Sequence, residues 1–109
     1  MKPNWHGVFP AATTHFKSDF SHDLAAYQTH LDKMVKAGVH GMIALGTVGE
    51  NCSHEYAEKL MVLEAAKEAI AGRVPLLSGV AETTTALACR FARDCEKLGL
   101  DGLMVLPAM

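Results

Sequence analysis

The sequence of 109 residues lacks the marks of a secreted, membrane-spanning or nucleic-acid-binding protein. Its three cysteines are an odd number without a C-x-x-C pair, and the start MKPNWHGVF has no apolar signal-peptide run. No apolar stretch approaches the ~20 residues that a membrane-spanning helix needs. Ten basic and twelve acidic residues give a formal net charge of −2, with no block of one sign. We therefore expect a cytoplasmic protein that binds neither nucleic acid nor membranes.

The histidines give no sign of a metal site, and no motif implies a cofactor. None of them has a second histidine at the i, i+4 spacing with an acid in register, as a helical zinc site would require. The six are His6, His15, His22, His30, His40 and His54. Half of the residues are hydrophobic, which is enough for one packed core.

Glycine and small polar residues divide the chain into alternating strands and helices. Apolar runs predict strands over residues 7–13, 41–45, 74–80 and 101–107. Helices with caps at residues 21–23, 53 and 83–85 are expected between them, with stops at Gly38, Gly72 and Gly99. The strands are apolar throughout rather than alternating, which is typical of a parallel sheet that is covered on both faces.

An internal repeat indicates which α/β architecture this is. The stretches GVHGMIALGT, residues 38–47, and GLDGLMVLPA, residues 99–108, align without gaps at an offset of 61 residues. That offset equals two βα units of about thirty residues, the unit length of a (β/α)₈ barrel. An open flavodoxin-like sheet is the rival architecture.

The last expected strand has no helix after it. Apolar residues 103–106 would then have an uncovered face and an unpaired edge. We therefore expect residues 1–109 to be the N-terminal portion of a single barrel domain, supplying about its first four strands.

The candidate site is the turn Gly46-Thr47-Val48-Gly49-Glu50, which follows the second expected strand. Ligands of α/β proteins bind at the carboxyl ends of strands. The two glycines would let the backbone turn sharply and present N–H groups to a carboxylate or phosphate, beside the Thr47 hydroxyl. On the residues alone, a tight turn without a binding role remains an alternative.

Four stretches together resemble one known family. GVFPAATTHF, GTVGE, GRVPLLSGVAETTT and GLDGLMVLP, in this order and spacing, are similar to the dihydrodipicolinate synthase and N-acetylneuraminate lyase family. The resemblance implies a (β/α)₈ barrel, commonly a homotetramer, in which a lysine forms a Schiff base with pyruvate or another 2-oxo acid. Such enzymes catalyse aldol addition or cleavage, and some catalyse dehydration or deamination.

The resemblance also implies roles for individual residues. Gly46, Thr47 and Val48 would bind the carboxylate of the 2-oxo acid, and Thr47 would relay protons to a tyrosine of the fifth strand. Gly49 and Glu50 would support the turn, with Glu50 accepting hydrogen bonds from nearby N–H groups. Apart from the resemblance, the position of Ala11 and Thr13 at the end of the first expected strand predicts that they line the wall of the pocket. None of the seven lysines lies in an expected strand, so the catalytic lysine and the tyrosine are expected beyond Met109.

Two departures from the family pattern bear on the reaction. Val48 stands where the family has a second threonine, so one hydroxyl contact is missing. Ala108 and Met109 follow Pro107, where the synthases carry tyrosines. Both changes favour a catabolic aldolase, dehydratase or deaminase over dihydrodipicolinate synthesis. The rivals are a carboxylate-binding protein without the lysine and an open-sheet phosphate-binding protein.

Three other residues received structural interpretations. We expect Arg73 to form an ion pair at the N-terminal side of the strands. Glu82 is predicted to cap the following helix together with residues 83–85. Gly79 ends a strand, where packing and proximity to the pocket explain a small residue equally well.

Overall fold

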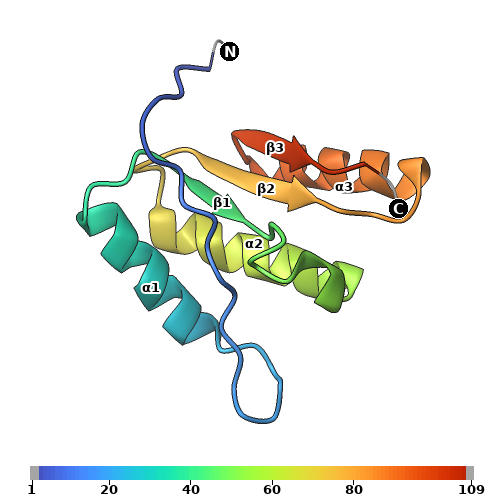
Figure 1. The fold of residues 1–109 in the computed structure, drawn as a ribbon, viewed down its shortest axis with the longest axis horizontal. Coiled ribbons are helices and arrows are strands. Elements are labelled where there is room, and N and C mark those ends of the chain that lie inside the picture. The colour runs from blue at the N-terminus through green and yellow to red at the C-terminus, as the bar shows by residue number, and fades with distance from the viewer. Residues whose placement is uncertain (1–2, 108–109) are drawn as a thin grey trace.

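The computed structural model describes residues 3–107, in which helices and parallel strands alternate (Figure 1). The elements are α1 (Leu24–Lys36), β1 (Met42–Ala44), the 3₁₀ turn η1 (Asn51–Ser53), α2 (Tyr56–Ile70), β2 (Leu76–Val80), α3 (Thr85–Leu98) and β3 (Gly102–Val105). The strands form a parallel sheet in the order β1-β2-β3. The predicted α/β class is confirmed. Ala108 and Met109 lie outside the described residues.

The first expected strand is present only as an extended segment beside β1. Ala11 forms a single parallel bridge with Ile43, and the Ala12 N–H donates to the Ile43 carbonyl at 2.9 Å. The Ile43 N–H donates in turn to the carbonyl of Pro10 at 3.0 Å. Proline has no N–H to give, so a regular ladder cannot run through this position. The prediction of a full strand over residues 7–13 was wrong, although the segment occupies the position of a strand.

The ends of α1 and α3 follow the predicted caps. The Asp23 carboxylate accepts from the Ala26 N–H at 3.1 Å, and Thr84 accepts from the Leu87 N–H at 3.1 Å. Gly38 and Gly99 follow these helices with φ of +100° and +83°, where glycine is favoured.

The start of α2 differs from the prediction. The expected cap, Ser53, lies in η1, and Glu55 is the N-cap of α2 instead. Glu55 and Glu58 form a reciprocal capping box, in which the Glu55 N–H donates to the Glu58 carboxylate at 2.8 Å. The turn after β1 therefore connects to α2 through η1 rather than directly.

All three helices pack on one face of the sheet. The side chains of Met42, Ala44, Leu76 and Val80 join residues of the helices in one buried cluster. The helical members are Tyr27, Leu31, Val62, Leu63, Ala65, Ala66, Ile70, Phe91 and Cys95. Helices on a single face fit a barrel wall and not a flavodoxin-like sheet, which carries helices on both faces.

The opposite face of the sheet carries a second, smaller set of contacts. Ile43 and Leu77 are register partners and lie outside the helix-side cluster. At the start of β3, a Cβ on Gly102 would come within 2.5 Å of the Trp5 ring. The N-terminal segment thus covers the sheet near the start of β3, on the face opposite the helices. In a (β/α)₈ barrel this face points inward.

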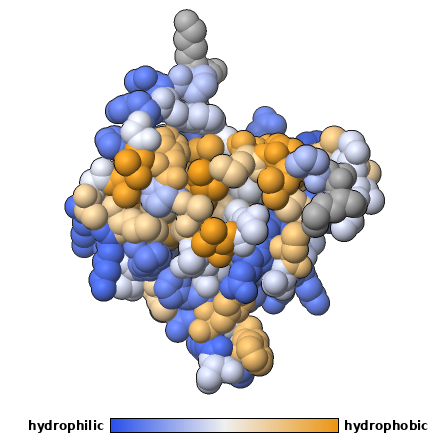
Figure 2. Space-filling view, in the orientation of Figure 1, coloured by the Kyte–Doolittle hydropathy of each residue, from blue (hydrophilic) through white to orange (hydrophobic). Residues whose placement is uncertain are grey.

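The far edge of the sheet is apolar and open. Within residues 3–107, β3 pairs only with β2, and Met104, Val105 and Leu106 are 45%, 64% and 41% exposed. Figure 2 shows hydrophobic residues over the strands in the middle of one face of the molecule. Such an edge presents unpaired backbone groups to which another strand could pair. Among the described residues, no helix has the length and apolar character to cross a membrane.

At the helix-side core, the Tyr27 hydroxyl is buried without a hydrogen-bond partner within residues 3–107. Burial raises the pKa of Tyr27 well above its usual range. Tyr56 is a contrasting case, because its hydroxyl donates to the Asp94 carboxylate at 2.5 Å. Burial, followed by this bond, raises the pKa of Tyr56 to about 12.

We predict that Tyr27→Phe raises the free energy of unfolding by ~1 kcal/mol, because it removes an unpaired buried hydroxyl. Tyr56→Phe, the matched control, should lower it. An unfolded tyrosine titrates near pH ~10 and folded Tyr27 titrates higher, so wild-type stability falls as the pH rises through this range. The advantage of Tyr27→Phe should therefore widen above pH ~10 in urea unfolding. A destabilised Tyr27→Phe protein would show that the hydroxyl has a partner.

Candidate functional site

The turn after β1 is shaped by two residues that are not glycine. Leu45 and Glu50 have φ of 54° and 60°, in the left-handed region, whereas Gly46 and Gly49 do not have positive φ. Such conformations cost ~1–3 kcal/mol each and are common where a site over-determines the backbone. The left-handed positions around this turn are therefore Leu45 and Glu50, and neither of its two glycines has a positive φ.

The two glycines differ in why the site contains them. A Cβ on Gly49 would lie 3.0 Å from the Ala12 carbonyl oxygen and 3.1 Å from the Leu45 nitrogen, so the space admits little more than a hydrogen atom. A Cβ on Gly46 would meet nothing within 4 Å. Close backbone packing therefore requires glycine at position 49, whereas it does not require glycine at position 46.

Asn51 holds the turn from within. Its buried side-chain amide donates to the Leu45 carbonyl at 2.8 Å and lies 3.4 Å from the carbonyl of Gly79. The Asn51 N–H donates to the Gly46 carbonyl at 3.3 Å. One residue therefore joins the end of β1 to the end of β2. This role of Asn51 was not predicted, since nothing in the local sequence pattern shows which carbonyls an asparagine side chain reaches.

Gly79 lets the two strand ends approach. A Cβ at this position would lie only 2.2 Å from the Leu45 carbonyl oxygen and 3.0 Å from the Gly46 Cα. Of the two interpretations that the sequence left open for Gly79, the structure supports backbone packing, and this packing sets the position of the turn.

The Gly49 carbonyl is held from the other side. It accepts a hydrogen bond from the Thr14 hydroxyl at 2.7 Å and contacts His54 Nε2 at 3.1 Å, both buried. Together with Asn51, these contacts hold the turn at Gly46 and Gly49. Thr47 and Val48, which lie between them, are exposed.

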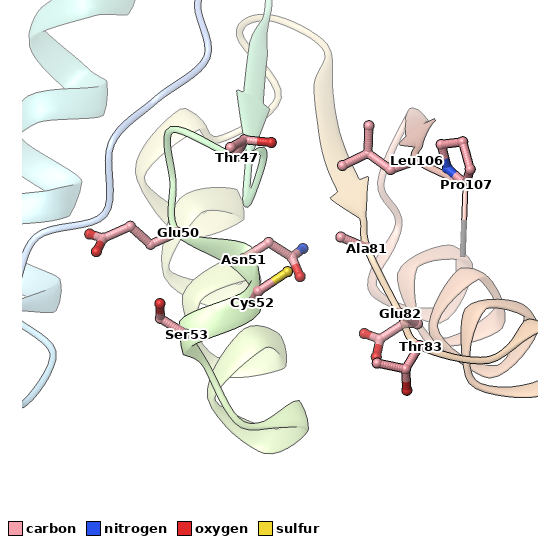
Figure 3. A pocket seen from close by; sticks show the side chains of 10 residues that line it. All are labelled: Thr47, Glu50, Asn51, Cys52, Ser53, Ala81, Glu82, Thr83, Leu106 and Pro107. Carbon is pink, nitrogen blue, oxygen red and sulfur yellow. The ribbon is translucent and has the colours of Figure 1, made fainter. Parts of the chain in front are cut away.

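A cleft of about 550 Å³ opens beside the turn, at the carboxyl ends of the strands (Figure 3). It is lined by Thr47, Glu50, Asn51, Cys52, Ser53, Ala81, Glu82, Thr83, Leu106 and Pro107. Figure 3 shows the Thr47 hydroxyl directed toward the side of the cleft where Leu106 lies. No acceptor within residues 3–107 takes a hydrogen bond from the N–H groups of Thr47 or Val48. The turn thus offers a hydroxyl at the cleft together with N–H groups that have no acceptor in the described part of the chain.

Four of the predicted site residues do not line this cleft: Gly46, Val48, Gly49 and Ala11. The side chain of Val48 is nevertheless 55% exposed. Ala11 is exposed beside β1, on the face that carries Ile43. Thr13 is also exposed and does not line the cleft.

Glu50 contributes differently from the prediction. In Figure 3 the Glu50 carboxylate points away from the opposite side of the cleft, where Ala81 lies. No N–H group within residues 3–107 donates a hydrogen bond to this carboxylate. The expected hydrogen bonds are therefore absent from the described part of the chain. The left-handed backbone of Glu50 turns its side chain outward, and the residue shapes the turn by conformation.

Glu82 also departs from its predicted role as a cap. Its carboxylate lies 2.8 Å from Lys59 Nζ, in a pair whose side chains are 10% and 5% exposed. The Lys59 ammonium also lies 5.9 Å from the centre of the Phe91 ring. This buried pair ties α2 to the connection between β2 and α3. A lysine of α2 with an acid 23 residues later is a contact that sequence spacing does not reveal.

The predicted ion pair of Arg73 is confirmed at the opposite end of the strands, where a guanidinium nitrogen of Arg73 lies 2.9 Å from the Asp32 carboxylate. Residues 3–107 contain no group of three or more histidine, cysteine, aspartate or glutamate side chains that could hold a metal ion.

We predict that Gly79→Ala lowers the free energy of unfolding by ~3 kcal/mol, because its methyl group overlaps the Leu45 carbonyl. Gly46→Ala is the matched control and should change it by less than ~0.5 kcal/mol, since the added methyl meets no atom. Urea unfolding of both variants measures the difference. Equal effects would show that the strand ends are not in contact as described.

The chain is similar to proteins of one known family. The model of the dihydrodipicolinate synthetase family matches residues 4–108. A 4-hydroxy-tetrahydrodipicolinate synthase from Methanosphaerula palustris is 39% identical over 104 residues, which are 94% of this chain and 36% of that protein.

Solved structures agree. A prophage protein of the dihydrodipicolinic acid synthase family from E. coli K12, in complex with pyruvate, superposes with a TM-score of 0.89 at 27% identity, over 94% of this chain and 35% of that one. An N-acetylneuraminate lyase from Mycoplasma synoviae superposes with a TM-score of 0.88 at 26% identity, over 94% and 36%.

The chain spans about a third of the length of these relatives. Its parallel strands and helices have the fold of the first strands of a (β/α)₈ barrel, as predicted. The cleft lies at the carboxyl ends of those strands, and the turn that borders it carries the sequence Gly-Thr-Val-Gly-Glu. This chain belongs to the dihydrodipicolinate synthetase family.

Proposed function

We propose that this chain is the N-terminal portion of a single (β/α)₈ domain that forms a Schiff base with pyruvate or a related 2-oxo acid. The observation that carries this proposal is the turn at the cleft, where Thr47 and Val48 have N–H groups without an acceptor in residues 3–107. The pyruvate complex of a relative supports the substrate class. The open edge of β3 supports a continuing barrel.

The chemistry explains why the turn must be rigid. A lysine imine withdraws electrons from the 2-oxo carbon, so the adjacent carbon can lose a proton or break a carbon–carbon bond. This is efficient only if the carboxylate is held in place while the bonds change. The clamp formed by Asn51, Gly79 and the Gly49 carbonyl contacts provides that rigidity.

Thr47 is proposed to bind the carboxylate and transfer protons. Its hydroxyl faces the cleft, and a hydroxyl can both accept and donate a proton without placing a charge beside the imine. Gly46 and Val48 are proposed to contribute backbone groups to the carboxylate site. Ala11 is proposed to form part of the pocket wall when the barrel is complete.

The nucleophile is proposed to lie further along the barrel. None of the lysines within residues 3–107 lines the cleft, and Lys59, the buried one, is paired with Glu82. No cofactor is needed for this chemistry, since the lysine imine itself serves as the electron acceptor.

The reaction is proposed to be an aldol cleavage or addition, or the dehydration or deamination of a 2-oxo acid. Val48 leaves the turn without a second hydroxyl, which favours a catabolic role over dihydrodipicolinate synthesis. Assembly as a homotetramer in the cytoplasm is part of the same proposal, supported by the family membership and by three unpaired cysteines.

Borohydride trapping tests the proposal. When the full-length protein is incubated with pyruvate and reduced, we predict a covalent adduct on one lysine, seen as a single mass increase in the intact protein. Omission of pyruvate is the control. An unmodified mass at saturating pyruvate would contradict the Schiff base and favour a carboxylate-binding protein of the same fold.

We further predict that Thr47→Val lowers kcat by ~10²-fold, the usual scale for loss of a positioned proton-transfer group. Val48→Thr is the matched control and should mainly change the KM for the 2-oxo acid, because it alters binding and not proton transfer. Steady-state kinetics with circular dichroism to verify folding measure both. Wild-type turnover in Thr47→Val would show that Thr47 shapes the turn but does not transfer protons.

A further inference from the structure

We propose that His22 and His54 form a hydrogen-bonded pair that positions the carboxylate-binding turn through the Gly49 carbonyl. This inference rests on the proposed function. Neither histidine lines the cleft, so both are positioning residues and not catalytic ones.

The pair forms a continuous chain of contacts that ends at the turn. His22 Nε2 lies 2.8 Å from His54 Nδ1, and His54 Nε2 lies 3.1 Å from the Gly49 carbonyl oxygen. At the other end, His22 Nδ1 is 3.6 Å from a carboxylate oxygen of Glu58. The chain therefore runs from α2, through two imidazoles, to the backbone of the candidate site.

The surroundings keep this chain away from water. The ring of Phe16 stacks on His54 at a centroid distance of 5.6 Å and an interplanar angle of 24°, and it contacts His22 at 5.1 Å. His54 is only 7% exposed. Hydrogen bonds in such a site are stronger than at the surface, and a missing partner is more costly.

The acceptor at the turn fixes the order of the protons. A carbonyl can only accept, so His54 must carry its proton on Nε2 to bond to Gly49. The Nδ1 atom of neutral His54 is then an acceptor, and His22 must donate to it from Nε2. The free Nδ1 of neutral His22 consequently faces Glu58.

This order allows one added proton but not two. A proton on His22 Nδ1 creates a charged donor toward Glu58 and leaves both other bonds intact. A further proton on His54 Nδ1 would place two N–H groups against each other across 2.8 Å. Within residues 3–107, Glu58 is the only acid within ion-pair distance of either histidine. Of the acids next to the pair in the chain, the Asp23 carboxylate caps Ala26 and the Glu55 carboxylate belongs to the capping box of α2.

The consequence for the site follows from Gly49. Its carbonyl accepts from His54 and Thr14 at the same time, and a Cβ at this position would lie 3.0 Å from the Ala12 carbonyl oxygen. Loss of the His54 donor leaves Thr14 as the one remaining side-chain tether of this carbonyl. The turn would then hold a carboxylate less firmly in both the ground state and the transition state.

Two substitutions of His54 in the full-length protein distinguish loss of the N–H donor from loss of the imidazole ring. His54→Leu removes the donor, whereas the amide of His54→Gln can still donate to Gly49. We expect His54→Leu to raise the KM for pyruvate by ~10-fold with kcat within ~3-fold, the pattern for loss of uniform binding. His54→Gln should recover most of the wild-type KM, and His30→Leu, outside the pair, should leave it unchanged.

Rescue by His54→Gln is the readout that a purely structural role of the ring would not give, because the amide restores the donor to Gly49 without restoring the imidazole. A wild-type KM in His54→Leu, or equal impairment of the Leu and Gln variants, would overturn the proposal.

A measurement without substrate keeps this proposal separate from the proposed function. Long-range ¹H–¹⁵N spectra should show neutral His54 protonated on Nε2, and hydrogen exchange at the Glu50 and Asn51 amides should accelerate in His54→Leu but not in His30→Leu. Absence of a pyruvate adduct in the wild type would contradict the Schiff base alone. Unchanged exchange at these amides, or a His54 proton on Nδ1, would contradict the role of the pair.

Discussion

The contact between the Leu45 carbonyl and the backbone of Gly79 is the constraint on which the site depends. It brings the end of β1 against the end of β2 so closely that only glycine fits, and the Asn51 amide then bridges both carbonyls. On either side of the turn residues 46–49, Leu45 and Glu50 adopt left-handed backbone conformations. The strain of those residues is tolerated because buried hydrogen bonds hold the backbone on both sides.

A turn held at both ends can leave its middle unsatisfied. In most loops a free backbone N–H is satisfied by folding back on the chain or by water. Here the Glu50 N–H donates to the Thr47 carbonyl at 3.0 Å and closes a turn, and the N–H groups of Thr47 and Val48 at its start have no acceptor within residues 3–107. Thr47 lines the cleft, and Val48 follows it in the chain. Rigidity and unpaired donors are the two properties that binding of a small carboxylate needs.

The division of the sheet into two faces gives the turn its setting. Helices cover the face of Met42, Ala44 and Leu76, while Ile43 and Leu77 point to the other side. In a barrel this second face becomes the interior, and the carboxyl ends of the strands surround one shared site. The edge of the sheet at β3 is open within residues 3–107, and its apolar residues are exposed there.

Much of the fold could be predicted because its signals are local. Helical spacing, the Thr84 cap and glycines such as Gly99 depend on residues a few positions apart. The errors arose where a local signal competed with another. Pro10 lies within an apolar run but has no N–H for a ladder, and Ser53 was a weaker cap for α2 than the capping box of Glu55 and Glu58.

The site was less predictable because its supports lie far apart in the sequence. Thr47 was found from the turn motif. Gly79, Glu82 and His22 act on partners 23 to 34 residues away, and no periodicity encodes such contacts. The pairing of His22 with His54, at a separation of 32 residues, illustrates this, since each appears in the sequence as an isolated histidine.

A crystal structure of the full-length protein with bound pyruvate would test the central claim most directly. The account predicts that the carboxylate receives hydrogen bonds from the N–H groups of Thr47 and Val48, with the contacts of Asn51 and Gly79 unchanged. A carboxylate bound away from these groups, or a turn that rearranges to bind it, would contradict the claim that the turn is prepared in advance.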